Sequence, residues 1–284
     1  MKLKIATTGL SGLLGSRIHE LLANEVEFIM LSQAELDITQ KAAVNSYLDR
    51  IDADFLLHLA AFTNVDACET ERETAWAINV EGTRNLLEAA QKKDMQFIYM
   101  STGFVFDGTH PPYFEDSTPN PISHYGLTKY EGEKMVKDKG MIVRIDYPYG
   151  NQTLQKKDFV ATIIEALQQK KPIKGIQDQI FTPTYIDDIS GALLYLFHNF
   201  RPDIYHIVGA DSTSGSAAIQ TIGEVFNIDT RWVASTTYDE FYAQKAKRPR
   251  NNELKSKKNT FYAMKSFKQG LVDLRSRMDY HFSL

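Results

Sequence analysis

The first half of the chain alternates short apolar runs with segments in which apolar residues recur every three or four positions. Runs of the first kind are typical of strands buried on both faces, and the second spacing is typical of amphipathic helices. We expect strands at residues 4–8, 28–31, 55–59, 97–100 and 141–145. We expect helices between them at residues 13–22, 42–48, 75–91 and 125–137. This alternation predicts an α/β fold, a Rossmann-type doubly wound parallel sheet.

The second half of the chain is less regular. Helices are expected at residues 159–169, 189–198 and 219–226, a strand at 204–208, and a basic loop with Pro172 at 170–175. Beyond Thr236 the pattern weakens, and Lys, Arg and Asn accumulate. We therefore expect a first domain of residues 1–150, with a later return segment near 179–200, and a smaller C-terminal α/β lobe of residues 151–284.

Composition narrows the class of protein. The net charge of −4 over 284 residues argues against a general nucleic-acid-binding surface, and the single cysteine, Cys68, excludes an internal disulfide framework. No apolar run reaches the roughly 18 residues that a membrane span needs. The N-terminal residues lack the apolar run of a signal peptide, so we expect a cytoplasmic protein without a membrane partner. We expect no metal site, since the sequence shows no cluster of metal ligands.

The first expected strand runs directly into a glycine-rich turn that precedes a helix. Residues without a Cβ permit a tight turn and a close approach to a pyrophosphate, and the helix N-terminus offers free N–H groups. The bare G-x-x-G-x-x-G pattern fits an ordinary turn equally well, but its place between strand and helix favours a dinucleotide. The candidate cofactor-binding residues of this turn are Gly9, Ser11, Gly12, Leu13, Leu14 and Gly15.

The residues after the second expected strand bear on the choice of cofactor. An acid there would bind the adenosine ribose and indicate NAD, whereas this strand is followed by Ser32 and Gln33. The missing acid permits NADP(H), with NAD(H) as the alternative. The Leu-Asp-Ile-Thr segment that follows contains Asp37 and Ile38. The Asp37 carboxylate could either contact the adenine ring or accept backbone hydrogen bonds in a turn.

Tyr125 and Lys129 lie four residues apart on an expected helix and therefore share one face. A lysine charge lowers the pKa of a nearby tyrosine, which could then exchange a proton with a carbonyl oxygen. Such pairs also occur on ordinary helix surfaces. The pair becomes specific beside Thr102, because ligands bind beyond the carboxyl ends of strands in such sheets. His58, on an apolar strand, is expected to be a core histidine.

These features together resemble the extended short-chain dehydrogenase/reductase family. Further segments resemble its dTDP-4-dehydrorhamnose reductase group, and the similarity extends to about Asn251. The segments are residues 36–39, 60–66, 77–83, 101–108, 125–129, 181–184 and 248–251. The resemblance implies hydride transfer from NAD(P)H to a 4-keto sugar, a catalytic triad of Thr102, Tyr125 and Lys129, and a C-terminal lobe for the sugar nucleotide.

The resemblance also implies further site residues. Near the cofactor we expect Ala60, Ala61, Thr63 and Asn79, although Asn79 could also support the helix of Tyr125 or cap local backbone. The basic segment 245–258 is either a solvated face or, by the resemblance, the source of a diphosphate clamp. The candidate substrate-binding residues are Thr63, Val65, Gly103, Phe104, Tyr147, Arg248 and Arg250.

Two positions depart from the group, and two rival functions remain open. Gly103 stands where the group usually carries Asp, and Tyr147 stands where it usually carries Trp, so the exact sugar is undetermined. One rival resembles the regulatory subunit of methionine adenosyltransferase, a non-catalytic NADP-binding protein with similar motifs. The other is an epimerase or dehydratase on the same fold. The expected partner is a nucleotide sugar, not a nucleic acid, and a homodimer is left open.

Overall fold

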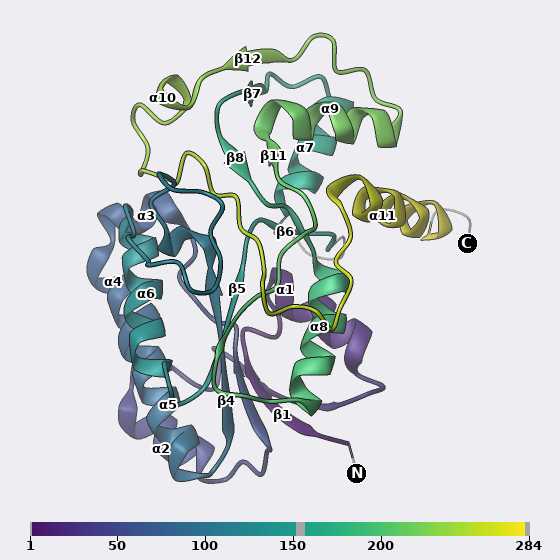
Figure 1. Ribbon diagram of the computed structural model, residues 1–284. Helices are drawn as coiled ribbons and strands as arrows, with labels where there is room; N and C mark the ends of the chain where they lie inside the picture. The colour runs from purple at the N-terminus through teal and green to yellow at the C-terminus, as the bar shows by residue number, and fades with distance from the viewer. Residues whose placement is uncertain (1, 152–156, 282–284) are drawn as a thin grey trace.

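A six-stranded parallel sheet forms the centre of the molecule, in the order β10-β5-β4-β3-β1-β2 (Figure 1). The computed structural model describes residues 2–151 and 157–281. β1 pairs with both β2 and β3, so successive strands are added first on one side of β1 and then on the other. This strand order confirms the doubly wound α/β prediction. The strands are β1 (Lys4–Thr8), β2 (Glu27–Leu31), β3 (Phe55–His58), β4 (Gln96–Thr102), β5 (Met141–Ile145) and β10 (Ile204–His206).

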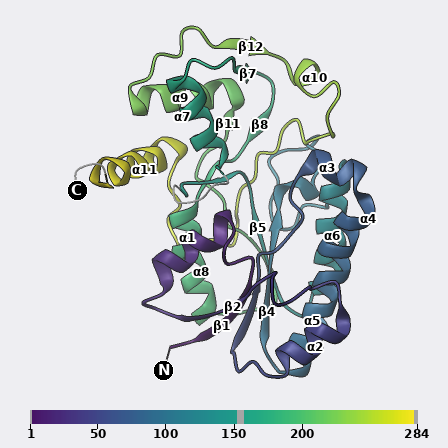
Figure 2. The same ribbon diagram turned by 180° about the vertical axis from the view of Figure 1, so that it is seen from behind.

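Helices cover both faces of this sheet, as the alternation of side chains along β4 illustrates. Phe97 and Tyr99 pack toward α2, α5 and α6, whereas Ile98 and Met100 pack toward α1 and α8. Figures 1 and 2 show these two layers on opposite sides of the sheet. The helices are α1 (Leu13–Leu22), α2 (Lys41–Leu48), α5 (Gly82–Lys92), α6 (His124–Val136) and α8 (Ile186–His198).

The single helix expected at residues 75–91 is wrong in detail. Two short helices, α3 (Val65–Thr70) and α4 (Arg72–Trp76), come first, and a π-helical turn, η1 (Ala77–Glu81), then leads into α5. The wider turn carries Asn79, whose side chain bonds to a neighbouring loop and to α6. Such tertiary bonds offset the poorer backbone geometry of a π-turn, which often marks a functional site.

A smaller lobe lies above the carboxyl ends of the strands (Figure 1). Its core joins α7 (Phe159–Gln168), α9 (Gly215–Phe226) and α11 (Phe267–His281). Sequence reasoning missed α11, and it placed residues 170–175 wholly in a loop although β7 begins at Lys174 and pairs with β12. The other elements are β6 (Pro148–Tyr149), β7 (Lys174–Ile176), β8 (Ile180–Phe181), β9 (Thr184–Tyr185), β11 (Thr213–Ser214), β12 (Ala234–Thr236) and α10 (Tyr238–Phe241).

Part of the second half returns to the central sheet. β10 pairs with β5, and α8 covers the same sheet face as α1. Arg17 of α1 binds Asp187 of α8 through two hydrogen bonds of 2.8 and 2.7 Å. Within the described ranges, no helix is long and apolar enough to cross a lipid bilayer.

Candidate functional site

The carboxyl ends of β1, β3, β4 and β5 meet at one edge of the sheet, below the smaller lobe (Figure 1). The glycine turn follows β1 at this edge. Gly9 has a φ of +69°, and a Cβ there would stand 2.8 Å from the backbone nitrogen of Ala60. A Cβ at Gly15 would stand 2.6 Å from the Cα of Leu10. Only glycine fits these two positions, so α1 can begin directly against the turn.

Among the described residues, the N-cap of α1 provides no side chain for the first N–H groups of the helix. Gly12 occupies this N-cap. Asn151, which follows β6 in the chain, donates to the carbonyl of Leu13 at 2.6 Å and to Ser16 Oγ at 2.7 Å. Free N–H groups together with the positive end of the helix dipole favour an anion.

An acidic side chain, Glu35, lies beside Ser32 in the turn after β2, and sequence reasoning missed it. Ser32 Oγ and Tyr47 Oη donate to the Glu35 carboxylate at 2.9 and 3.2 Å. Asp37 accepts hydrogen bonds from the backbone and hydroxyl group of Thr39, so it has the geometry of a turn carboxylate. Glu35 could have been found from the sequence, because it lies only three residues after Ser32 and a single turn brings the two side chains together.

The loop after β3 carries Ala60, Ala61 and Thr63 and leads into α3 at Val65, and Asn79 fixes its path. The Asn79 amide accepts from the backbone nitrogen of Phe62 at 2.7 Å and donates to its carbonyl at 3.1 Å. The same amide donates to Thr128 on α6 at 2.9 Å. Asn79 is 1% exposed. Its side chain therefore joins the loop to the helix of Tyr125 rather than facing the open edge.

Tyr125, Thr102 and Lys129 come together at the end of β4. The Thr102 side chain acts on the Tyr125 phenol and lowers its pKa. Glycine at 126 lets the first turn of α6 press against the carbonyl of Phe104, which holds the helix next to the end of β4. The Lys129 ammonium lies 4.0 Å from the ring centre of Tyr99. All three predicted triad residues are buried at the same edge as the glycine turn.

The expectation that Lys129 lowers the pKa of Tyr125 is wrong for this structure. Burial raises the pKa of Tyr125, and the side chain of Thr102 offsets only part of this rise. Burial also lowers the pKa of Lys129 to about 7, against the opposing charge of Glu133. The effect of burial on the pKa of Tyr125 is therefore larger than any effect of the nearby lysine, on which the prediction relied. His58 is a core histidine as predicted, bonded to Thr8 and Thr83, and burial lowers its pKa to about 3.

A buried ion pair supports the floor of the site. Glu133, one helical turn beyond Lys129, accepts two hydrogen bonds from Arg144 of β5, at 2.8 and 2.7 Å. Ser101 Oγ donates to the same carboxylate at 2.6 Å. The side chains of Glu133 and Arg144 are 3% and 1% exposed. The pair ties α6 to β4 and β5 directly below the triad.

Gly103 follows Thr102 and is covered by two side chains that sequence reasoning did not select. A Cβ at this position would stand 3.1 Å from Asp146 Oδ1, and the Asn252 amide is closer still. Asp146 was detectable as an acid directly after an apolar strand. Asn252 gave no such signal, because it lies in the basic segment far along the chain. The carboxylate that seemed to be missing at position 103 thus has a counterpart at Asp146.

Tyr147 and Phe104 form an aromatic wall beside this cluster. Their ring centres lie 6.1 Å apart, and the tilted rings of Tyr147 and Phe181 have centres 4.3 Å apart. Phe104 contacts Tyr125 edge-to-face at 5.7 Å. Tyr147 has a φ of +38°, which is uncommon for a residue with a side chain and is often found at functional sites.

Both candidate arginines already have carboxylate partners. Arg248 forms a two-pronged pair with Asp66 of α3, with both distances 3.0 Å, and so connects the smaller lobe to the sheet domain. Arg250 pairs with Asp239 and Asp178 near the surface. Arg248 is thus the better placed of the two, because Asp66 immediately follows Val65.

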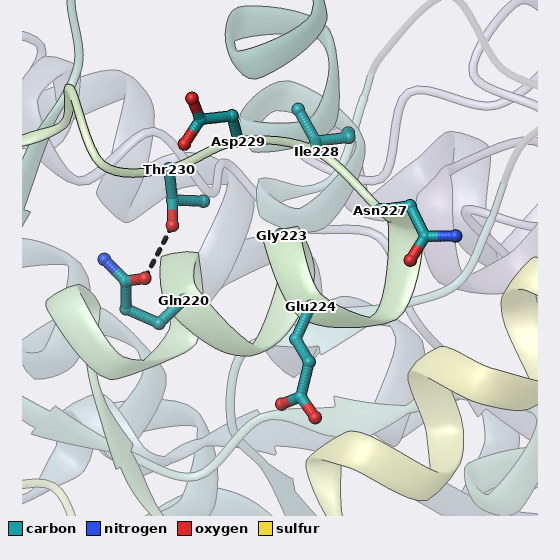
Figure 3. A pocket seen from close by; sticks show the side chains of 7 residues that line it. All are labelled: Gln220, Gly223, Glu224, Asn227, Ile228, Asp229 and Thr230. Atoms are coloured by element: carbon teal, nitrogen blue, oxygen red, sulfur yellow. Dashed lines mark hydrogen bonds between the residues drawn. The ribbon is translucent and has the colours of Figure 1, made fainter.

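A shallow hollow in the smaller lobe contains none of these residues. It lies at the C-terminal end of α9 and is lined by side chains of α9 and the following turn (Figure 3). There Thr230 donates to Gln220 at 2.6 Å. It offers no counterpart of the glycine turn or of Tyr125, and the candidate site remains the edge of the sheet. In the described part of the chain, no group of His, Cys, Asp and Glu residues is arranged to hold a metal ion.

Comparison with known proteins gives consistent matches over most of the chain. The sequence model of the family described as "RmlD substrate binding domain" matches residues 3–279. A dTDP-4-dehydrorhamnose reductase of Aggregatibacter actinomycetemcomitans is 31% identical over 74% of this chain and 75% of its own. The methionine adenosyltransferase 2 subunit beta of Xenopus tropicalis is 29% identical over 78% of this chain and 71% of its own.

A solved structure agrees with the sequence matches. It is the dTDP-4-dehydrorhamnose reductase of Bacillus anthracis strain Ames in complex with NADP, which is 31% identical to this chain. The two structures superpose with a TM-score of 0.91 over 98% of this chain and 100% of the other.

Proposed function

Since the chain belongs to the RmlD substrate binding domain family, we propose that it is an NADPH-dependent oxidoreductase that reduces the 4-keto group of a dTDP-linked deoxysugar. The substrate is dTDP-4-dehydrorhamnose or a close relative of it. The observation that carries the proposal is that Thr102 acts on the Tyr125 phenol at the carboxyl end of β4, with Lys129 buried one turn further along α6. The glycine turn follows β1 at the same edge of the sheet.

The glycine turn fits a dinucleotide because Gly9 and Gly15 leave no room for side chains and the first N–H groups of α1 have no side-chain cap. We place the pyrophosphate over this turn and the nicotinamide ribose near Tyr125 and Lys129. Asn79 acts indirectly, by holding the loop after β3. The other proposed cofactor contacts are Ser11, Gly12, Leu13, Leu14, Ser32, Asp37, Ile38, Ala60, Ala61 and Thr63.

In the proposed reaction, the hydride for the keto carbon would come from NADPH held at the glycine turn. The raised pKa of Tyr125 keeps its phenol protonated near neutral pH. The phenol therefore holds a proton for the carbonyl oxygen as negative charge develops there. Thr102 Oγ accepts the N–H of Phe104 at 3.2 Å, so its own O–H is a donor for an oxygen atom. Lys129, with a pKa of about 7, can accept or release a proton at neutral pH.

We place the sugar between the end of β4 and the smaller lobe. Thr63, Val65, Gly103, Phe104 and Tyr147 lie on this side of the site, and the aromatic pair offers a flat wall for the sugar or base. For the diphosphate we favour Arg248 over Arg250, because Arg248 spans the gap between the lobes.

The experiment replaces Tyr125 with phenylalanine. Turnover of dTDP-4-dehydrorhamnose should fall about 10²- to 10⁴-fold, since a positioned proton donor contributes that much. NADPH affinity should stay within about threefold, because the ring packing is kept. Tyr130→Phe is the matched control on the same helix, and it should leave turnover unchanged. Wild-type turnover in the Tyr125 variant would refute the proposal, and a wild type that reduces no keto sugar would favour a non-catalytic NADP-binding protein.

The remaining expectations continue as proposals. We propose that residues 1–150, with the return segment near 179–200, bind the cofactor and that residues 151–284 mainly bind the substrate. A cytoplasmic location and a homodimer are also proposed, and light scattering of the purified protein tests the second.

A further inference from the structure

The volume that a side chain at position 103 would occupy is filled from two distant segments. A Cβ on Gly103 would stand 3.1 Å from Asp146 Oδ1 and 2.9 Å from Leu254 Cδ1, with the Asn252 amide closest of all. Asp146 follows β5, and Asn252 lies in the basic segment of the smaller lobe. The sheet domain, through Asp146, and the smaller lobe, through Asn252, therefore meet beside Thr102.

The Asn252 amide is held in one place. Its Nδ2 donates to Asp146 Oδ1 at 2.9 Å, while Asp146 Oδ2 accepts from the backbone nitrogen of Thr182 at 2.9 Å. Asn252 and Asp146 are 2% and 1% exposed. Burial raises the pKa of Asp146, and the hydrogen bonds from Thr182 and Asn252 oppose this rise.

The other end of this amide lacks a partner. Among the described residues, Asn252 Oδ1 is buried without a hydrogen bond. An acceptor left in this state destabilises the protein, and native structures rarely retain one without a ligand, an ion or a water molecule as its partner. The natural complement of an amide oxygen is an O–H or N–H donor.

The cluster lies close to the reacting groups. Gly103 is the neighbour of Thr102, and the charge of Asp146 acts on the Tyr125 phenol. We propose that Asn252, positioned by Asp146, determines sugar specificity, with its amide oxygen accepting a hydrogen bond from a hydroxyl group of the sugar. The proposal rests on the proposed function insofar as the substrate is a sugar nucleotide. Because the oxygen is buried, the contact forms as the segment of Asn252 adjusts around the entering sugar.

The test compares binding of dTDP and dTDP-rhamnose to the NADP⁺ complex by titration calorimetry. In Asn252→Ala, affinity for dTDP-rhamnose should fall about 3- to 10-fold, which is the size of one neutral hydrogen bond. Affinity for dTDP should not change, and this also reports that the variant is folded. Asn259→Ala is the control just beyond this segment, since the Asn259 side chain accepts a hydrogen bond from the nearby backbone nitrogen of Tyr262.

Each outcome decides the proposal. A selective loss for the sugar-bearing ligand supports it. An unchanged affinity for dTDP-rhamnose, or an equal loss for both ligands, overturns it. Turnover of a keto sugar by the same preparations tests the reaction separately. A wild type that turns over substrate while Asn252→Ala keeps full sugar affinity refutes only the role of Asn252. A wild type without turnover, combined with a selective loss in the variant, refutes only the reaction.

Discussion

Replacing Glu133 with glutamine should destabilise the protein by about 3–5 kcal/mol, the cost of removing one partner of a buried ion pair. Glu133 accepts bonds from Arg144 at 2.8 and 2.7 Å and from Ser101 at 2.6 Å, and both charged side chains are almost fully buried. Glutamine keeps the shape and one acceptor, but it leaves the Arg144 guanidinium without a counter-charge. At about 2–4 °C per kcal/mol for a protein somewhat smaller than this one, the melting temperature should fall by roughly 5–15 °C.

Urea unfolding followed by circular dichroism measures this change through the midpoint at constant m-value. Glu131→Gln is the control, because Glu131 forms a partly exposed pair with Lys134 on the same helix, and it should cost less than about 1 kcal/mol. Replacing Glu133 with leucine and Arg144 with methionine together should recover most of the loss, since no unpaired charge remains. A single Glu133→Gln variant within about 1 kcal/mol of wild type would show that the pair is not the structural tie inferred here.

Three further changes test other parts of the site. Gly15→Ala should weaken NADPH binding at least about tenfold by fluorescence titration, because its Cβ would push α1 away from the turn. Retained affinity would place the cofactor elsewhere. Glu35→Gln should raise the preference for NADPH over NADH about fivefold, since a carboxylate beside Ser32 repels a 2′-phosphate by about 1 kcal/mol at 4 Å in water; an unchanged ratio argues against an adenosine site there. Lys129→Met should gain stability relative to wild type at pH 6, and this gain should shrink as pH rises from about 7 toward 10.5. The reason is that the folded pKa lies below the unfolded value, so the penalty for the buried charge acts fully only at low pH. Equal gains in urea unfolding at pH 6 and pH 9.5 would contradict the lowered pKa.

The sheet domain could be predicted because its strands and helices depend on patterns of apolar residues within short stretches of sequence. Buried parallel strands require continuous apolar runs, and their covering helices require an apolar stripe, so β1, α1 and β5 coincide with the predicted ranges. The π-turn η1 was not predictable, since it depends on bonds from Asn79 to residues outside its own helix. For α11 the signal existed in the spacing of Phe267, Leu271 and Leu274, but the surrounding polar residues hid it.

Some features of the candidate site could likewise be predicted from the sequence, and others could not. Thr102, Tyr125 and Lys129 follow from spacing and from the rule that ligands bind at strand ends. Their pKa values do not, because burial depends on the whole fold. Asp146 and Asn252 were not recognised as a pair, since they are 106 positions apart and only tertiary folding brings them together.

The return of α8 and β10 to the central sheet has a consequence for synthesis on the ribosome. Ile189, Leu193 and Phe197 of α8 complete the apolar layer over one face of the sheet, and β10 covers the open edge of β5. A nascent chain that has emerged only to about residue 150 lacks both. It presents an uncovered apolar face and an unpaired strand edge, the features that promote aggregation and attract chaperones. The sheet domain should therefore reach its native state only after residue 207 has left the exit tunnel, late in translation rather than as an independent first step.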